Sequence, residues 1–593
     1  MPSAEERSRT PWRRSVRANR SWLWLLAPFS LLYLVLHSSP VSWSVKWEKV
    51  PLRPGSRRTT HVLKPDIGLL EMNNSISEVR HPLVELIERA ERLWEGKLAT
   101  QSTTLREAYN EYIRRYKRKP PKGFDAFQWS RKRDVQLLDE FDQIHADLEL
   151  FWGVDPKELR KVQQELEHYA DTFTIGKNSA GDNVTVLTHN IIGNEEWGFY
   201  SADLQIEALS GISSRIPPFH ATWTVHDGAR YFYSWERKEA ARQAAAAGTY
   251  VKMVTTKIQT PGWAMACSPD APIHRSNHTR PLFEDVVGYQ SSVPKSFIAD
   301  LRASMDPCSS PDLIPLSTLA DRRIEPRPDW KFVPQFGPSK TLLHSDILGV
   351  PLLESTDEAP DTISWANKSD QRMVWRGRTT GCGDSATWDI WRRSARLRLV
   401  ELANLKNGTV PVLLPPLGDN SVTETRELEL SALNELFDVG IPEICDRIEA
   451  TYTMKGYVFP EQDKRYKYVL DVTWSSRFRR LMARNSLVFK STMYPEWWLD
   501  RAMPWVHFVP VKYDYSDLYD TFVFFRGLPD GSIAGQDRLG ERIATAGRDW
   551  VNKFWGPDDI TAYTWRLYLE WVRLCSENRT AMDFVLGKDD PLP

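Results

Sequence analysis

From about residue 183 onward, short apolar runs alternate with amphipathic stretches, and this alternation constrains the fold more than any other feature of the sequence. Strands that alternate with helices form parallel sheets, because a parallel connection must cross over the sheet. A polar, proline-containing stretch near 350–365 divides the runs into two groups. The sequence therefore predicts an α/β chain with two sheets. The runs, which are rich in Val, Ile and aromatic residues as β-strands are, read VTVLTHNI, ATWTVHD, TYVKMVTT, RMVWRG, KYVLDVTW, SLVFKS and VHFVPV.

The beginning of the chain has the pattern of a membrane anchor. Six arginines fall within residues 1–20, and an uncharged apolar stretch fills 21–39. A helix over this stretch, at ~1.5 Å per residue, just covers a hydrocarbon core of ~30 Å. Arginines stay on the cytosolic side, so we expect a cytosolic tail, a transmembrane signal anchor and a lumenal remainder in the ER or Golgi. A cleaved signal peptide is the alternative.

Six glycosylation sequons support a lumenal location for the remainder of the chain. The five cysteines form no CxxC pair, so a zinc knuckle is not expected, and one or two disulfides of open connectivity fit an oxidising lumen. The formal net charge of -1 argues against a nucleic-acid partner, which requires a basic excess. The sequon asparagines are Asn73, Asn183, Asn277, Asn367, Asn407 and Asn578.

A chain of 593 residues is too long for one hydrophobic core, so we expect two large domains with additional segments. Helical periodicity begins near His81, with further helices expected at 104–118, 131–151 and 156–172. A last helix from Asp558 to Cys575 carries an apolar line suited to dock on the first sheet. The expected segments are a cytosolic tail (1–20), anchor (21–39), stem (40–78), helical region (79–175), N-terminal domain (176–360), C-terminal domain (361–555) and a C-terminal helix with a tail (556–593).

The sequence has no D-x-D triplet, which many glycosyltransferases use to hold a metal on the donor diphosphate, and no GxGxxG or GxxxxGK loop. A transferase without the triplet must neutralise the diphosphate with cationic side chains and backbone amides. One candidate is VWRGRTTGCG, where a strand runs into a Gly-rich turn that carries Arg376, Arg378 and Thr379. A plain turn with surface ion pairs fits the spacing equally well.

A second candidate anion site is KYVLDVTWSSRFRRLMARNSLVFKS, a strand, turn, helix and strand. Ser475 or Ser476 would cap a helix whose first turn holds Arg477, and the free N–H groups of a helix N-terminus attract anions. An ordinary capped helix is the alternative. Glu496, before two tryptophans, could accept hydrogen bonds from a ribose, although a helix-start role after Pro495 fits the spacing better.

Taken together, these segments and the run PWVHFVPVKYDYSDL resemble glycosyltransferase family 90, over roughly residues 80–530. That family includes fungal capsule-associated xylosyltransferases and animal Rumi-type protein O-glucosyltransferases, and the run EYIRRYKRKPPKGFDAF is similar to the fungal branch. The resemblance implies a GT-B-type fold, with two Rossmann-like domains facing a cleft, preceded here by the transmembrane helix and a helical stem region. It also implies a donor nucleotide in the C-terminal domain and an acceptor at the N-terminal one.

The resemblance implies an inverting, metal-independent transfer from a UDP-sugar. Arg376, Arg378 and Arg477 would face the diphosphate with Ser476, and Glu496 the nucleoside. The frame IPPFHATWTVHDGAR implies that the general base is Asp227, with Asp270 in reserve; the alternative is that Asp227 only starts the HDG turn. His226 fits a satisfied turn histidine better than a base.

We therefore expect a glycosyltransferase of the secretory pathway that moves xylose, or less favourably glucose, from a UDP-sugar to a hydroxyl of a glycan or glycoprotein, with no metal or other cofactor and no nucleic-acid partner. The alternative is a membrane-anchored inactive homologue or a lectin-like carbohydrate-binding protein, for which the richness in tryptophan is suggestive. A glycoside hydrolase would need two facing carboxylates, and the sequence identifies no such pair.

Overall fold

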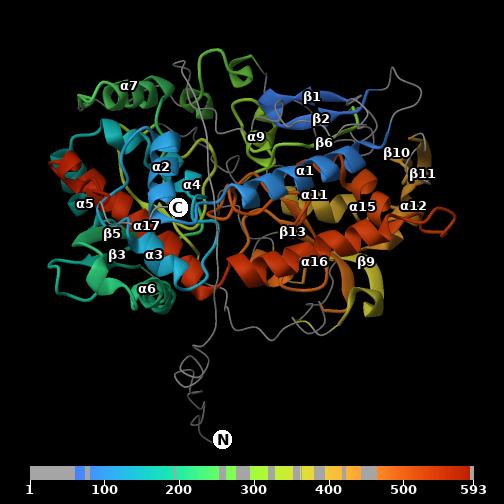
Figure 1. Ribbon diagram of the computed structural model, residues 1–593. Helices are drawn as coiled ribbons and strands as arrows, with labels where there is room; N and C mark the ends of the chain where they lie inside the picture. The colour runs from blue at the N-terminus through green and yellow to red at the C-terminus, as the bar shows by residue number, and fades with distance from the viewer. Residues whose placement is uncertain are drawn as a thin grey trace, which may run out of the picture.

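In the computed structural model, two five-stranded sheets lie side by side with helices packed around them (Figure 1). A three-stranded sheet and a two-stranded hairpin accompany them. The structure describes residues 61–73, 80–192, 195–252, 262–275, 294–317, 328–351, 361, 363–378, 394–416, 423–442 and 464–587.

The C-terminal sheet is parallel at each of its four strand pairs, in the order β12-β9-β13-β14-β15. The carboxyl ends of its strands therefore share one edge, where ligands of open α/β sheets bind. Its strands are β9 (Asp370–Arg376), β12 (Phe437–Gly440), β13 (Tyr466–Val472), β14 (Leu487–Ser491) and β15 (Val509–Pro510).

The N-terminal sheet is mixed, in the order β4-β3-β5-β7-β8, and the expectation of a second Rossmann-like parallel sheet is wrong. β3 pairs antiparallel with both β4 and β5, and the β5–β7 and β7–β8 pairs are parallel. The short link at 178–184 makes β4 antiparallel to β3, because a parallel connection needs about a dozen residues or more. The strand predicted from TYVKMVTT does not form over 249–252, and its remainder lies outside the described residues. The strands are β3 (Thr172–Lys177), β4 (Thr185–Asn190), β5 (Phe219–Thr224), β7 (Phe336–Gly337) and β8 (Ile347–Leu348).

Part of the expected stem is instead built into the fold. β2 pairs antiparallel with β1 on one side and with β6, more than 200 residues later, on the other. Pairing at that separation leaves no local signal in the sequence. The elements are β1 (Val62–Lys64), β2 (Leu69–Glu71) and β6 (Ser296–Ile298).

The helical region, which the sequence placed before the two domains as a stem, is divided between them. α1 (Pro82–Ala99) contributes its apolar face to the core around the C-terminal sheet, whereas α2 (Leu105–Tyr116) and α5 (Pro156–Leu166) belong to the core around the N-terminal sheet. α2 begins at a capping box formed by Thr104 and Glu107.

The helix predicted over 131–151 is interrupted. Only α3 (Ala126–Arg131) and α4 (Asp142–Leu148) form, since Asp134 and Leu137 between them adopt positive φ angles of 61° and 54°. A continuous helix cannot accommodate this left-handed backbone.

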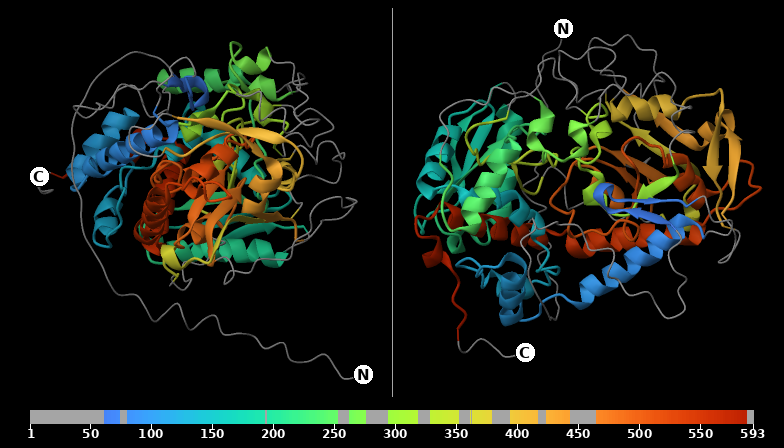
Figure 2. Two further views of the ribbon diagram at one scale, coloured as in Figure 1. Left: turned by 90° about the vertical axis from the view of Figure 1, so that its right-hand side faces the viewer. Right: turned by 90° about the horizontal axis from the view of Figure 1, so that it is seen from above.

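Two long helices join the two halves of the molecule, as Figure 1 and the right-hand view of Figure 2 show. α16 (Asp537–Phe554) packs beside β14, and α17 (Pro557–Cys575) crosses to the N-terminal sheet. There Trp571 Nε1 donates to the His220 carbonyl at 2.8 Å, and Trp223 Nε1 donates to the Tyr568 hydroxyl at 3.2 Å. The predicted docking of the last helix on the first sheet is confirmed.

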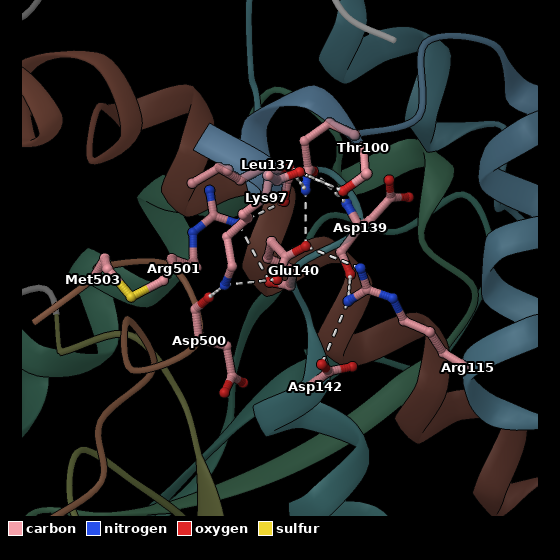
Figure 3. Close-up of polar contacts among 12 residues, drawn as sticks. Lys97, Thr100, Arg115, Leu137, Asp139, Glu140, Asp142, Asp500, Arg501 and Met503 are labelled. Atoms are coloured by element: carbon pink, nitrogen blue, oxygen red, sulfur yellow. Dashed lines mark hydrogen bonds and ion pairs between the residues drawn. The ribbon is translucent and has the colours of Figure 1, made fainter. Parts of the chain in front are cut away.

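A buried ionic junction fastens α1 and α2 to the C-terminal half (Figure 3). The Glu140 carboxylate accepts from Arg115 at 3.0 Å and pairs with Lys97 at 3.0 Å. Arg501 donates to the Leu137 carbonyl at 3.0 Å. Burial opposes ionisation of Glu140, but Arg115 and Lys97 outweigh it and hold its pKa well below the ordinary value. The junction thus fixes the 137–142 turn against the segment that precedes α16.

The expected membrane-spanning helix is not supported. Residues 21–39 lie outside the described ranges, and within those ranges no helix combines the length and the apolar character needed to cross a bilayer. The fold class is therefore corrected to a mixed α/β chain with several sheets. Its remaining elements are α6 (Glu195–Leu209), α7 (Trp235–Ala246), α9 (Leu301–Ser304), α11 (Ala395–Leu402), α12 (Leu430–Leu433), α14 (Phe478–Met482), α15 (Leu518–Arg526), β10 (Thr409–Leu413) and β11 (Thr425–Glu429).

Candidate functional site

Asp227 lies in the turn that follows β5, at the carboxyl end of that strand. Two hydrogen bonds hold the turn: the His226 N–H donates to Thr224 Oγ1 at 3.1 Å, and the Ser339 hydroxyl donates to the Asp227 carbonyl. The carboxylate remains accessible, yet the surrounding protein displaces water and raises its pKa above the ordinary value. The charges of Arg396 and His226 oppose that rise. A carboxylate with a raised pKa at an open rim is suited to accept a proton.

His226 is engaged elsewhere. Its Nε2 lies 3.0 Å from Asp171 Oδ2, and the ring is exposed. This agrees with the sequence interpretation of a satisfied turn histidine. Asp270, the reserve candidate, is exposed on the segment that also carries the Cys267–Cys308 disulfide, and its carbonyl accepts from Arg275 at 3.2 Å.

A pocket opens beside Asp227, between the N-terminal sheet and α6. Its wall contains a neutral polar group, Gln205, together with aromatic rings. Among the described residues that line it, Asp227 and His226 are the charged or titratable ones, and none is a lysine or arginine. The residues that line it are Phe173, Trp197, Ser201, Leu204, Gln205, Trp223, Thr224, Val225, His226, Asp227, Pro338 and Pro351.

Across from Asp227, arginines gather at the carboxyl edge of the C-terminal sheet. Arg376 is the last residue of β9; its guanidinium pairs with Asp438 at 2.8 Å, and its carbonyl accepts from Arg477 at 2.7 Å. Arg378 is exposed two residues later, and its carbonyl accepts from Arg396 at 3.3 Å. The structure thus brings three of the predicted residues, Arg376, Arg378 and Arg477, to one edge. Thr379 lies outside the described residues.

The turn after β13 positions Arg477. The expected serine cap is not formed: α14 begins at Phe478 with Arg477 as its N-cap residue, and no side chain caps it. The Ser475 hydroxyl instead accepts from the backbone N–H and Nε of Arg477, both at 3.3 Å. These bonds are local to the turn and direct the side chain toward β9. Ser476 is half-buried beside it.

Glu496 is buried beneath this turn in an ionic cluster, which we call the Lys490 cluster and which consists of Asp471, Lys490 and Glu496. Lys490 Nζ lies 2.7 Å from Asp471 and 3.4 Å from Glu496, and it donates to the Thr473 carbonyl at 3.0 Å. Burial raises the pKa of Glu496 to about 7, against the opposing charge of Lys490. Contact between Glu496 and a nucleoside stays a prediction.

Sequence reasoning missed Arg396 and the two partners of Glu496 in the Lys490 cluster, Asp471 and Lys490. Arg396 lies in the first turn of α11, and its guanidinium reaches Thr473 Oγ1 at 3.4 Å. Its charge also acts on Asp227. In the sequence it is one of several arginines in a helical stretch, so its place at the gap between the two halves depends on tertiary structure. Lys490 alternates like any strand residue, and only its burial distinguishes it.

Comparison with known proteins identifies the family of the C-terminal part of the chain. Residues 418–583 match the family model described as Glycosyl transferase family 90. This segment belongs to glycosyltransferase family 90. It contains Arg477 and the Lys490 cluster, whereas Asp227, Arg376 and Arg396 precede it. The predicted family resemblance is confirmed.

Individual relatives match over shorter stretches. Protein O-glucosyltransferase 1 of Rattus norvegicus is 32% identical over 120 residues, which cover 20% of this chain and 29% of the relative. O-glucosyltransferase rumi of Drosophila pseudoobscura pseudoobscura is 34% identical over 125 residues, with the same two shares. Uncharacterized protein 035R of Invertebrate iridescent virus 3 is 28% identical over 169 residues, 28% of this chain and 14% of the relative. The chain thus spans less than a third of the length of these relatives.

Proposed function

We propose that this chain is an inverting glycosyltransferase of the secretory pathway. It moves xylose or glucose from a UDP-sugar to a hydroxyl group of a glycan or glycoprotein, and it does so without a metal ion. The observation that carries the proposal is the set of hydrogen bonds that joins Arg477 to Arg376 and Arg396 to Arg378 at the carboxyl edge of the C-terminal sheet. Asp227 lies at the carboxyl end of β5 in the other half. The charge of Arg396 acts on Asp227, so the cationic edge and the carboxylate lie near each other.

The arginine edge supports the donor half of the reaction. The Arg477 guanidinium donates to the Arg376 carbonyl. The Arg396 guanidinium donates to the Arg378 carbonyl and to the Thr473 hydroxyl. Guanidinium groups form charge-assisted hydrogen bonds with phosphate oxygens and stabilise a departing diphosphate in place of a metal. The absence of a D-x-D triplet from the sequence is consistent with this arrangement.

Asp227 supplies the acceptor half. The proton of the acceptor hydroxyl passes to the Asp227 carboxylate while the hydroxyl oxygen forms a bond to the anomeric carbon. The bond between that carbon and the diphosphate oxygen breaks, and UDP leaves with the electron pair from the opposite face. A single in-line displacement of this kind inverts the anomeric configuration. The raised pKa of Asp227 favours proton capture as the new bond forms.

An oxidising compartment is supported by the covalent structure. Cys267 and Cys308 form a disulfide, and disulfides persist mainly outside the cytosol. Four sequon asparagines among the described residues are exposed, as glycosylation requires. They are Asn183, Asn367, Asn407 and Asn578.

Binding of UDP to the purified protein tests the proposal. The unfolding temperature should rise with UDP concentration, since a ligand at about 100 times its Kd adds about 2.7 kcal/mol to the free energy of unfolding. Arg477→Ala should lose most of the rise, and Arg426→Ala should keep it, because Arg426 pairs with Glu424 on the β10–β11 hairpin. EDTA should leave transfer unchanged. The absence of any shift at millimolar UDP would contradict the proposal, and glycan binding without it would favour the lectin-like alternative.

A further inference from the structure

The pocket beside Asp227 is built differently from the arginine edge. None of the described residues that line it is a lysine or arginine, so none of them neutralises a phosphate there. We infer that it binds a neutral pyranose ring of a glycan acceptor, with Trp197 against the ring and Gln205 bonded to a hydroxyl of that ring. The inference rests on the proposed function and names the acceptor class.

One face of α6 carries the chemistry that a sugar ring requires. Trp197, Ser201 and Gln205 follow each other at intervals of four residues, so they lie on one side of the helix, and all three line the pocket. Along this side of the helix, the exposed indole of Trp197 is followed by the half-buried hydroxyl of Ser201 and then by the buried amide of Gln205. A pyranose has the matching character, with an apolar C–H face and a rim of hydroxyl groups.

Gln205 is the residue that most constrains what the pocket can bind. Its side chain is only 4% exposed, and its Nε2 donates to the Val350 carbonyl at 2.9 Å. Because a carbonyl can only accept, this bond fixes the orientation of the amide and leaves Oε1 as the hydrogen-bond acceptor of the side chain. Oε1 is buried and has no hydrogen-bond partner within the described part of the chain. A buried acceptor without a donor is costly, and a ligand hydroxyl would supply the donor.

Trp197 is placed to receive the ring. The indole is 40% exposed although it lies in a pocket wall, and it contacts Tyr200, which is 46% exposed, with ring centroids 6.0 Å apart. Trp223 also lines the pocket, but it is buried and its N–H donates to the Tyr568 hydroxyl. Trp223 therefore forms the floor of the pocket. Exposed aromatic rings beside one another are typical of surfaces that bind a partner with an apolar face. A ring lying on Trp197 brings its hydroxyl groups toward Asp227.

Binding and transfer can be measured separately. The probe is a set of neutral methyl glycosides and their oligosaccharides, added to the full chain and followed by saturation-transfer NMR, without any nucleotide. Trp197→Ala and Gln205→Ala should each weaken glycoside binding, and should raise the acceptor KM, by about tenfold, since each loses an interaction of about 1–1.5 kcal/mol. Donor hydrolysis in the absence of acceptor should stay unchanged in both. Tyr250→Ala is the control, because Tyr250 is an exposed aromatic residue outside the pocket.

The outcomes distinguish this inference from the proposed function. If both variants bind glycosides and use acceptors like the parent protein, the acceptor subsite is elsewhere and the inference is overturned. It is also overturned if only a polypeptide with a serine or threonine hydroxyl accepts the sugar and no glycoside binds. Glycoside binding that depends on Trp197 and Gln205 in a chain that fails to bind UDP would support the pocket and reject the transferase.

Discussion

Replacement of Lys490 by methionine tests whether the Lys490 cluster supports the arginine edge. Lys490 is fully buried at the carboxyl end of β14 and is the cation nearest to two buried carboxylates, Asp471 and Glu496. It also holds the carbonyl of Thr473, whose φ of 64° lies in the left-handed region. Methionine has a similar length without the charge, so the change removes the ammonium group and little packing.

The expected cost follows from burial. Removing one partner of a buried ion pair destabilises a protein by about 3–5 kcal/mol, because the remaining charge stays desolvated without compensation. A left-handed β-branched residue adds strain of about 1–3 kcal/mol that the lost hydrogen bond no longer offsets. We therefore expect the free energy of unfolding to fall by at least about 3 kcal/mol. UDP affinity should fall as well, because Arg477 follows the Thr473 turn.

Unfolding in urea, followed by tryptophan fluorescence, measures the loss. The matched control is Lys467→Met on the adjacent strand β13, where Lys467 pairs at 2.6 Å with Asp537, a residue that is 53% exposed. A pair with a solvated partner contributes about 1 kcal/mol or less. If the two variants lose the same free energy, or if Lys490→Met keeps full UDP affinity, the reasoning about the cluster is refuted.

Three further predictions concern stability. Glu140→Ala should lower the free energy of unfolding by about 3–5 kcal/mol in urea denaturation, because Lys97 and Arg115 lose a shared buried carboxylate. A loss below about 1 kcal/mol would show that the ionic junction of Figure 3 does not stabilise the fold. The pKa of Glu496 is raised to about 7 from 4.5, so its stabilising contribution is complete below pH 4.5 and disappears as pH rises through 7; Glu496→Gln should flatten the fall in stability between pH 5 and 8, and parallel pH profiles would refute this. Cys308→Ser opens a link between residues 41 apart and should cost about 4 kcal/mol, whereas an unchanged urea midpoint would show that the disulfide does not contribute.

Local patterns in the sequence sufficed to predict the elements that local physics determines. Helical periodicity from His81 and the expected helix at 104–118 correspond to α1 and α2, and the Val-rich and aromatic runs predict β9, β13 and β14. The apolar line of α17 predicts its docking on the N-terminal sheet. In each case the residues that decide the structure lie within a few turns of one another.

What the sequence could not show depends on partners that are distant along the chain. The direction of β3 relative to β5 is set by pairing, and apolar runs look alike in parallel and antiparallel sheets. At the site, Arg396 meets Thr473 across 77 positions, and no spacing rule connects them. Glu496 follows Pro495 as a helix-start residue would, so the spacing gave no sign that its carboxylate is buried against Lys490.

The most direct test of the whole account is the rate of sugar transfer by Asp227→Asn, measured together with its affinity for UDP. The substitution keeps the shape of the side chain and removes its ability to take a proton. We expect transfer slower by about 10²–10⁴-fold, the usual contribution of a general base. UDP affinity should be unchanged, because the arginine edge lies on the other half of the molecule. Transfer at the rate of the parent protein would contradict the account.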